Sequence, residues 1–241
     1  MRIALLLRGN AVTMRRVLLA AGLAVFSVLA LAQGASAQGA PVRLPITADD
    51  GSPIMNHQIM PRQAAEAEKL PGAVVAANPK GDVTVVEFYD LNCPYCRRAS
   101  ADLDALIKAD KKMRLVLVPF PVLGIASIQA GRVEIAVSKA VPPATFYQYH
   151  RKLYEGRGTI DGQRAVAAME PFKLDQQKIV DVANQDSITD IMKAHVRFAD
   201  TVGLKATPSY LIHDVALQGH PGQKTIKSIV DSVRKCGKAV C

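Results

Sequence analysis

A strand that runs directly into two cysteines and then a helix is the feature that most limits how this chain can fold. Residues 83–89 read Val-Thr-Val-Val-Glu-Phe-Tyr, which is apolar on both alternating faces except for one glutamate. Such a run is typical of a central strand covered on both sides. The sequence Cys-Pro-Tyr-Cys follows at residues 93–96, and residues 94–109 have the pattern of a helix. A strand predicted at residues 114–118, Arg-Leu-Val-Leu-Val, completes a strand-helix-strand unit, which favours a parallel pair of strands.

The rest of the pattern predicts that helices interrupt an α/β sheet. Residues 125–203 carry apolar side chains at helical spacing. After them, residues 209–212 and 215–217 predict a hairpin, followed by a closing helix. Because strands lie on both sides of the helical block, we expect it to be an insertion. The predicted organisation is an α/β domain made of residues 72–124 and 204–241, with residues 125–203 as an inserted helical domain.

The first 37 residues have the order of an export signal. Arg15 and Arg16 precede an apolar stretch at residues 17–32, and small residues close the segment at positions 35–37. This order predicts a cleaved signal peptide over residues 1–37. An uncleaved membrane anchor is the alternative, but the apolar stretch is shorter than the ~20 residues that a spanning helix needs. Residues 38–71 then read as a polar leader that contains a short helix at residues 62–70.

Composition excludes several classes of protein. The 241 residues are 49% hydrophobic and 21% charged, which is ordinary for a globular chain. The formal charge is +9, from 30 basic and 21 acidic residues. Four of the arginines lie in residues 1–37, so the remaining excess is small. Basic residues occur in runs no longer than pairs and without interleaved aromatic residues, which argues against nucleic acid as a partner.

The position of the two cysteines predicts thiol chemistry. Cys93 falls at a helix N-terminus, where free backbone N–H groups and the helix dipole stabilise a thiolate. Pro94 occupies the first helical position, where no N–H is needed. Arg97 and Arg98 add positive charge nearby. A lowered pKa would make Cys93 a nucleophile and a good leaving group, and Cys96, one turn further along, is placed to resolve a mixed disulfide.

Other roles for the four cysteines stay open at this point. Cys93 and Cys96 could bind zinc if Cys236 and Cys241 supplied a second ligand pair, or they could form a purely structural bridge. We favour a redox role for Cys93 and Cys96, because a strand, Cys-Pro-x-Cys and a helix occur together in a chain with an export signal. For Cys236 and Cys241 we expect a local structural disulfide, with a second redox pair as the alternative.

Three segments around these cysteines resemble one known family. They are residues 85–97, Val-Val-Glu-Phe-Tyr-Asp-Leu-Asn-Cys-Pro-Tyr-Cys-Arg, residues 120–124, Phe-Pro-Val-Leu-Gly, and residues 206–210, Ala-Thr-Pro-Ser-Tyr. The sequence is similar here to the DsbA-like thiol-disulfide oxidoreductases of the bacterial envelope, and within them to the branch that includes ScsC and Com1-type proteins. The resemblance extends over about residues 72–235 and implies a thioredoxin fold with an inserted helical domain.

The resemblance also implies roles for residues outside the cysteine pair. An isolated carboxylate at Glu87, in the middle of an apolar strand, should have a raised pKa. The family keeps an acid there as a proton acceptor near the second cysteine, so we expect Glu87 to be catalytic. The alternative is a glutamate at the strand end that reaches a surface lysine. In this family a cis-proline lies beside the cysteine pair, which implies that Thr207 and Pro208 bind substrate together with Pro94 and Tyr95.

The expected function is therefore a periplasmic protein thiol-disulfide oxidoreductase that exchanges disulfides with unfolded or reduced secreted proteins, most simply a disulfide oxidase. Oxidases of the family often have valine before the cis-proline and histidine between the cysteines. Thr207 and Tyr95 occupy those positions here and resemble the isomerases and reductases, which are the alternative. A non-catalytic peptide-binding module is a further alternative. The motif implies no metal and no organic cofactor, and it implies a DsbB-like or DsbD-like membrane redox partner.

Overall fold

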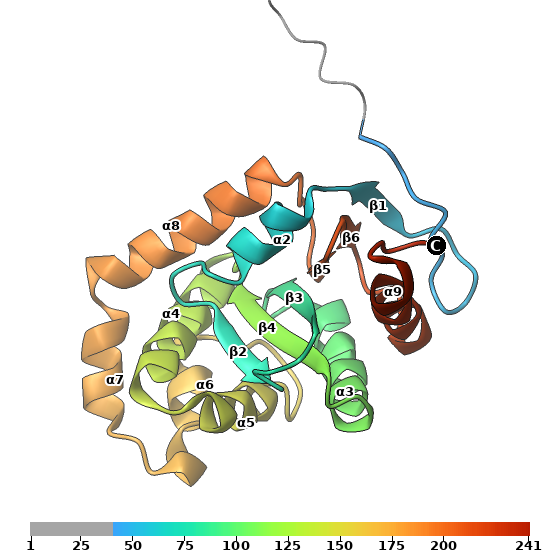
Figure 1. Ribbon diagram of the computed structural model, residues 1–241. Helices are drawn as coiled ribbons and strands as arrows, with labels where there is room; N and C mark the ends of the chain where they lie inside the picture. The colour runs from blue at the N-terminus through green and yellow to red at the C-terminus, as the bar shows by residue number, and fades with distance from the viewer. Residues whose placement is uncertain (1–40) are drawn as a thin grey trace, which may run out of the picture. The chain divides into compact units, whose positions relative to one another are not determined.

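The computed structural model describes residues 41–241, which form one unit around a six-stranded sheet (Figure 1). The strand order is β1-β6-β5-β3-β4-β2. The predicted signal peptide at residues 1–37 lies outside the described residues. The strands are β1 (Met55–Gln58), β2 (Val74–Ala77), β3 (Val83–Tyr89), β4 (Met113–Pro119), β5 (Ser209–Ile212) and β6 (Val215–Gln218).

Helices connect these strands and form the inserted block. The helices are α2 (Pro61–Ala67), α3 (Pro94–Ala109), α4 (Ile125–Ala140), α5 (Pro143–Leu153), α6 (Gly162–Ala167), the 3-10 helix η1 (Glu170–Phe172), α7 (Gln176–Ala183), α8 (Asp186–Thr201) and α9 (Gln223–Cys236). The elements from α4 to α8 separate β4 from β5 in the chain, as the sequence predicts. No helix within residues 41–241 combines the length and the apolar character needed to cross a membrane.

Strand β3 lies at the centre of the sheet, as the sequence predicts. It pairs in parallel with β4 and antiparallel with β5, where Glu87 lies opposite Tyr210. Val85, Val86 and Phe88 are fully buried, because helices cover both faces of the sheet. The parallel pair follows from the crossover through α3. The predicted fold class is confirmed by this sheet and its interrupting helices.

The two faces of the sheet have separate cores. Alternate residues of β3 and β5, with Val85, Tyr89 and Tyr210 among them, pack with α3 and α9. The opposite residues, with Phe88 and Leu211 among them, pack with α2 and α8 (Figure 1). Since side chains of a strand alternate between faces, Glu87 points to the same side as α3 and its cysteines. The sheet thus places the one carboxyl of β3 in the layer beneath α3, the helix that begins at the two cysteines.

Residues 38–71 contribute a strand that the sequence analysis did not predict. β1 pairs antiparallel with β6, with Met55 opposite Gln218, and extends the sheet at that edge. The following helix spans Pro61–Ala67 rather than residues 62–70. Pro61 occupies one of its first two positions, where the missing N–H costs nothing.

Candidate active site

The junction of β3 and α3 places both cysteines at one helix N-terminus. Cys93 is the N-cap residue with extended backbone, and Pro94 opens the helix. Cys93 is 4% exposed and Cys96 1% exposed, and both are free thiols in the structure. The Thr207–Pro208 peptide bond is cis, and Cys93 Sγ lies 3.1 Å from the carbonyl oxygen of Thr207. The fold therefore brings the cysteine pair together with the proline loop that the sequence analysis selected.

The Cys93 thiol is the more acidic of the two. A hydrogen bond from the Cys96 thiol lowers the pKa of Cys93 to about 6. The Thr207 side chain and the backbone of Tyr95 and Cys96 act in the same direction, against partial burial. Arg97 and Arg98 make their contacts with groups other than Cys93. The Arg97 guanidinium donates to the carbonyl oxygen of Tyr154, and both guanidinium groups lie over tyrosine rings. The acidity of Cys93 thus comes from local hydrogen bonds.

Cys96 and Glu87 form a buried pair of weak acids. Burial raises the pKa of the Cys96 thiol, and its hydrogen bond to Cys93 raises it further. Burial also raises the pKa of Glu87 to about 8, with smaller contributions from the charges of Cys93 and Glu134, while the Tyr210 hydroxyl acts in the opposite direction. Glu87 is 2% exposed, so the alternative of a carboxyl that reaches a surface lysine does not hold. A carboxyl with this pKa can accept or donate a proton near neutral pH.

Two polar residues between β3 and Cys93 hold the active-site turn in place. The Asp90 carboxylate, 1% exposed, accepts hydrogen bonds from the backbone of Asn92, Val122 and Leu123 and from the Ser127 hydroxyl. These bonds fix the loop after β4 against the turn that precedes Cys93. The Asn92 side chain adds two bonds to the backbone of Ile160, at 2.7 and 2.8 Å. Sequence patterns do not reveal these contacts, because the partners come from segments 30 to 70 residues away.

Apolar side chains are exposed around this turn. Tyr95, between the cysteines, is 57% exposed, and Leu123 and Ile125, after β4, are 54% and 75% exposed. Asp90 ties the loop that carries Leu123 to the turn that precedes Cys93. Exposed apolar groups at a loop next to a reactive centre are typical of surfaces that bind other chains.

A buried polar cluster lies where the inserted helices meet β3. The Glu134 carboxylate of α4 accepts a hydrogen bond from the Tyr89 hydroxyl at 2.7 Å, and its other oxygen lies 2.7 Å from Nδ1 of His150 in α5. None of the three side chains is more than 2% exposed. The charge of Glu134 also acts on Glu87. Sequence analysis missed this cluster, because one residue comes from the sheet and two come from different inserted helices.

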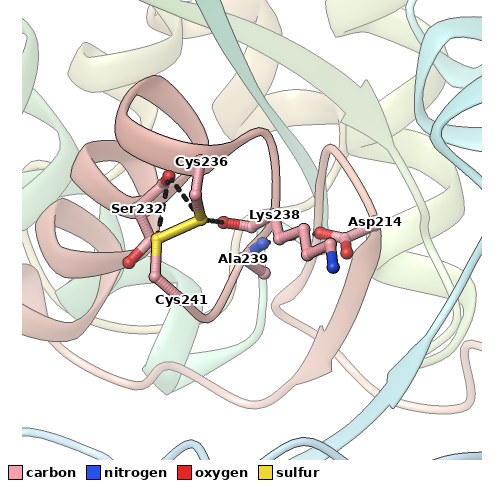
Figure 2. Close-up of a disulfide and its surroundings, with 6 residues drawn as sticks. All are labelled: Asp214, Ser232, Cys236, Lys238, Ala239 and Cys241. Carbon is pink, nitrogen blue, oxygen red and sulfur yellow. Dashed lines mark hydrogen bonds between the residues drawn. A yellow bond between two sulfur atoms is a disulfide. The ribbon is translucent and has the colours of Figure 1, made fainter.

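The other two cysteines, Cys236 and Cys241, form a disulfide bond with each other. Figure 2 shows the disulfide between Cys236, the last residue of α9, and Cys241. Between them the backbone N–H of Ala239 donates to the carboxylate of Asp214 at 2.7 Å, which holds the turn against the hairpin of β5 and β6. Because both sulfurs are part of a disulfide, the alternative in which they bind zinc does not fit the structure. Residues 41–241 contain no cluster of three His, Cys, Asp or Glu side chains arranged to hold a metal ion.

The low pKa of Cys93 leads to a direct prediction about pH. We expect the thiolate absorbance of the reduced protein to rise with a midpoint near the pKa of about 6. The pKa of Cys93 in the folded protein lies below its unfolded value near 9, so the thiolate stabilises the reduced fold. This stabilisation is complete above a pH of about 9 and is lost as the pH falls through about 6. Ultraviolet titration of the reduced protein measures the midpoint.

The control for this titration is Cys96→Ala, which removes the main hydrogen-bond donor to Cys93. The midpoint of the variant should move up toward the ordinary value for cysteine. An unchanged midpoint would show that some other group sets the acidity of Cys93.

Comparison with known proteins agrees with this geometry. A family model described as thioredoxin matches residues 69–232. Disulfide bond formation protein D of Bacillus subtilis (strain 168) is 22% identical over 181 residues, which are 69% of this chain and 79% of that protein. A thioredoxin-like oxidoreductase from Silicibacter pomeroyi DSS-3 has a solved structure that is 32% identical, with a TM-score of 0.65, over 70% of this chain and 98% of that one.

A more distant solved structure has the same fold. The catalytic domain of ScsC from Proteus mirabilis is 21% identical, with a TM-score of 0.62, over 72% of this chain and 97% of that one. The family model alone covers more than half of the chain and includes β3, the cysteine pair and the cis-proline loop. The chain therefore belongs to the thioredoxin family, which the family model and the 32% identical thioredoxin-like oxidoreductase both support.

Proposed function

We propose that this chain is a disulfide oxidase that introduces disulfide bonds into secreted client proteins. The observation that carries the proposal is the contrast between its two thiols. Local hydrogen bonds lower the pKa of Cys93 to about 6, whereas burial raises the pKa of Cys96. A stable Cys93 thiolate favours the reduced form of the pair, so the Cys93–Cys96 disulfide readily oxidises other thiols.

The proposed reaction has two exchange steps. A client thiolate attacks Cys93 Sγ in the disulfide, the Cys93–Cys96 bond breaks, and a client–Cys93 disulfide forms. Cys96 leaves as a thiolate and takes a proton from neutral Glu87, which is buried in the same layer. A second client thiolate then attacks the client sulfur and releases the Cys93 thiolate. The client loses two electrons, and the cysteine pair gains them.

The client chain would bind across the cis-proline loop. Thr207 and Pro208 lie against Cys93, where an extended segment could pair with exposed backbone. Tyr95 and Pro94 would contact the client from the other side of Cys93. The exposed side chains of Leu123 and Ile125 would add an apolar contact, which suits unfolded or reduced proteins.

An isomerase or reductase of the same fold is the second candidate. The observation that favours it is the identity of two residues, Tyr95 between the cysteines and Thr207 before the proline, which resemble those enzymes. All three activities use the same cysteines and differ in reduction potential, redox partner and oligomeric state.

The proposed location is the periplasm. The support is the export signal predicted for residues 1–37. An oxidase must be reoxidised after each turnover, so we expect a DsbB-like membrane redox partner. An isomerase or reductase would instead need a DsbD-like partner that keeps the pair reduced.

The reduction potential of the Cys93–Cys96 pair, measured together with the molecular mass in solution, tests the proposal. Equilibration with glutathione should give a potential near the ~−120 mV of the strong oxidant DsbA rather than the ~−270 mV of thioredoxin. A monomer with such a potential supports the oxidase. A markedly lower potential in an oligomer that repairs scrambled disulfides would overturn it in favour of the isomerase.

A further inference from the structure

A row of hydrogen-bonding side chains leads from the layer beneath the cysteines to the protein surface. Tyr210 of β5 lies opposite Glu87 in the sheet, and its hydroxyl acts to lower the pKa of Glu87. The same hydroxyl lies 2.9 Å from Nδ1 of His220, in the loop between β6 and α9. Nε2 of His220 lies 2.7 Å from the carboxylate of Asp102 on α3. Burial decreases along the row, with side-chain exposures of 5% for His220 and 35% for Asp102.

The role proposed for Glu87 favours such a connection. Glu87 is 2% exposed and its Oε1 is buried without a hydrogen-bond partner among the described residues, so little of the carboxyl is open to direct proton exchange with bulk water. A buried acid that turns over once in each catalytic cycle must recover its starting protonation state through neighbouring groups.

The other titratable neighbours of Glu87 do not provide a route. Cys93 and Cys96 are the reacting groups themselves. Glu134 is bonded to Tyr89 and His150, which are both buried. The remaining neighbours are Tyr147 and Tyr154 of the α5 region, whose buried hydroxyls have no hydrogen-bond partner among the described residues. Tyr210 lies opposite Glu87 in the sheet, and from Tyr210 hydrogen bonds lead through His220 to Asp102, which is partly exposed.

The donors and acceptors in this row can be aligned in one direction. The Tyr210 hydroxyl can donate to Nδ1 of His220, which leaves Nε2–H to donate to Asp102, and this is one of the two neutral forms of histidine. After one proton has moved along the row, His220 carries its hydrogen on Nδ1, which is the form that returns a proton toward Tyr210. The two forms thus serve the two directions in alternation.

We propose that Tyr210, His220 and Asp102 form a proton relay between Glu87 and solvent. This inference rests on the roles proposed above for Cys93, Cys96 and Glu87. When the cysteine disulfide re-forms, the proton of the Cys96 thiol passes to Glu87 and then to Tyr210, while the Tyr210 proton passes to His220. The Nε2 proton of His220 goes to Asp102 and then to water. When a client attacks Cys93, the same steps run inward and deliver one proton to the departing Cys96 thiolate.

The experiment measures how fast reduced dithiothreitol opens the Cys93–Cys96 disulfide from pH 5 to 9, using acid quench and alkylation of the freed thiols. Tyr210→Phe should slow the reaction by at least about tenfold, the low end of what positioned proton transfer contributes. The loss of its hydroxyl should also raise the pKa of Glu87, which shifts the alkaline limb of the pH profile upward. His220→Gln keeps hydrogen bonds but cannot ionise, and it should slow the reaction similarly.

The matched control is Tyr149→Phe. Tyr149 is also a fully buried tyrosine, but its hydroxyl donates to the carbonyl oxygen of Ala165, away from the relay. Removal of this hydroxyl should leave the pH profile of the reaction unchanged, even if it destabilises the fold. Asp102→Asn tests the relay at its partly exposed end and should also slow the reaction.

The outcomes distinguish a failure of the relay from a failure of the proposed function. If Tyr210→Phe, His220→Gln and Asp102→Asn all keep the rate and pH profile of the parent, the relay is wrong, although exchange by Cys93 still stands. If the three variants slow the reaction and Tyr149→Phe does not, the relay is supported. If Cys93→Ser retains exchange, the proposed function itself fails, whatever the relay variants do.

Discussion

Replacing Cys93 with serine is expected to lower the rate of thiol-disulfide exchange by at least about a thousandfold, as for other nucleophiles that carry a reaction. Cys93 is the thiol whose pKa is lowered to about 6, and it lies at the cis-proline loop. A serine hydroxyl does not ionise near neutral pH and cannot form a disulfide. The measurement is the rate at which the oxidised protein oxidises a reduced, unfolded substrate such as ribonuclease A.

Two other substitutions make this result specific. Cys96→Ala retains Cys93 as the attacking thiol, so the reduced variant should accumulate mixed disulfides with oxidised substrates instead of resolving them. The double variant Cys236→Ser and Cys241→Ser removes the disulfide that follows α9 and should keep the exchange rate. If activity survived in Cys93→Ser but vanished in the double variant, Cys236 and Cys241 would be the reactive cysteines.

The central part of the fold could be predicted because local patterns determine it. Strand β3 and helix α3 have continuous apolar patterns and clear ends, and the hairpin of β5 and β6 turns at His213, where the backbone has a positive φ of 52°. The position of Cys93 at a helix N-cap follows directly from the strand before it and from Pro94. Local sequence was therefore sufficient to find the reactive thiol.

Strand β1 could not be predicted because its sequence has no β-strand pattern. Its four residues read Met-Asn-His-Gln, with an exposed methionine and a buried asparagine. Asn56 is buried because its side chain bonds to the backbone of Leu44 and Ile54, and the strand forms because β6 offers a free edge. Both causes are tertiary, so neither is visible in the segment itself.

The surroundings of the cysteines were also only partly predictable. The charge pattern suggested that Arg97 and Arg98 would stabilise the Cys93 thiolate, but side-chain directions decide such effects. Arg97 instead bonds to backbone carbonyls near Tyr154. The row from Glu87 through Tyr210 and on to solvent combines side chains from two strands, a loop and a helix. Only the folded sheet brings them together.

Glu134→Ala is expected to cause a large loss of stability. Glu134 is fully buried and serves two partners, the hydroxyl of Tyr89 and Nδ1 of His150. Its removal would leave both groups buried without a partner, between β3 and the inserted helices. Breaking a buried polar pair in this way costs about 3–5 kcal/mol of unfolding free energy. Equilibrium unfolding in urea, with the cysteine pair kept reduced, measures this loss.

Two control variants separate the cluster from a general effect of mutation. Tyr89→Phe removes one hydrogen bond and leaves Glu134 paired with His150, so it should cost only about 1 kcal/mol. Glu155→Ala removes a carboxylate of similar size from a solvent-exposed pair with Lys152, where water screens the interaction, and should change stability little. If Glu134→Ala cost no more than Tyr89→Phe, the buried cluster would not be what joins the inserted helices to the central strand.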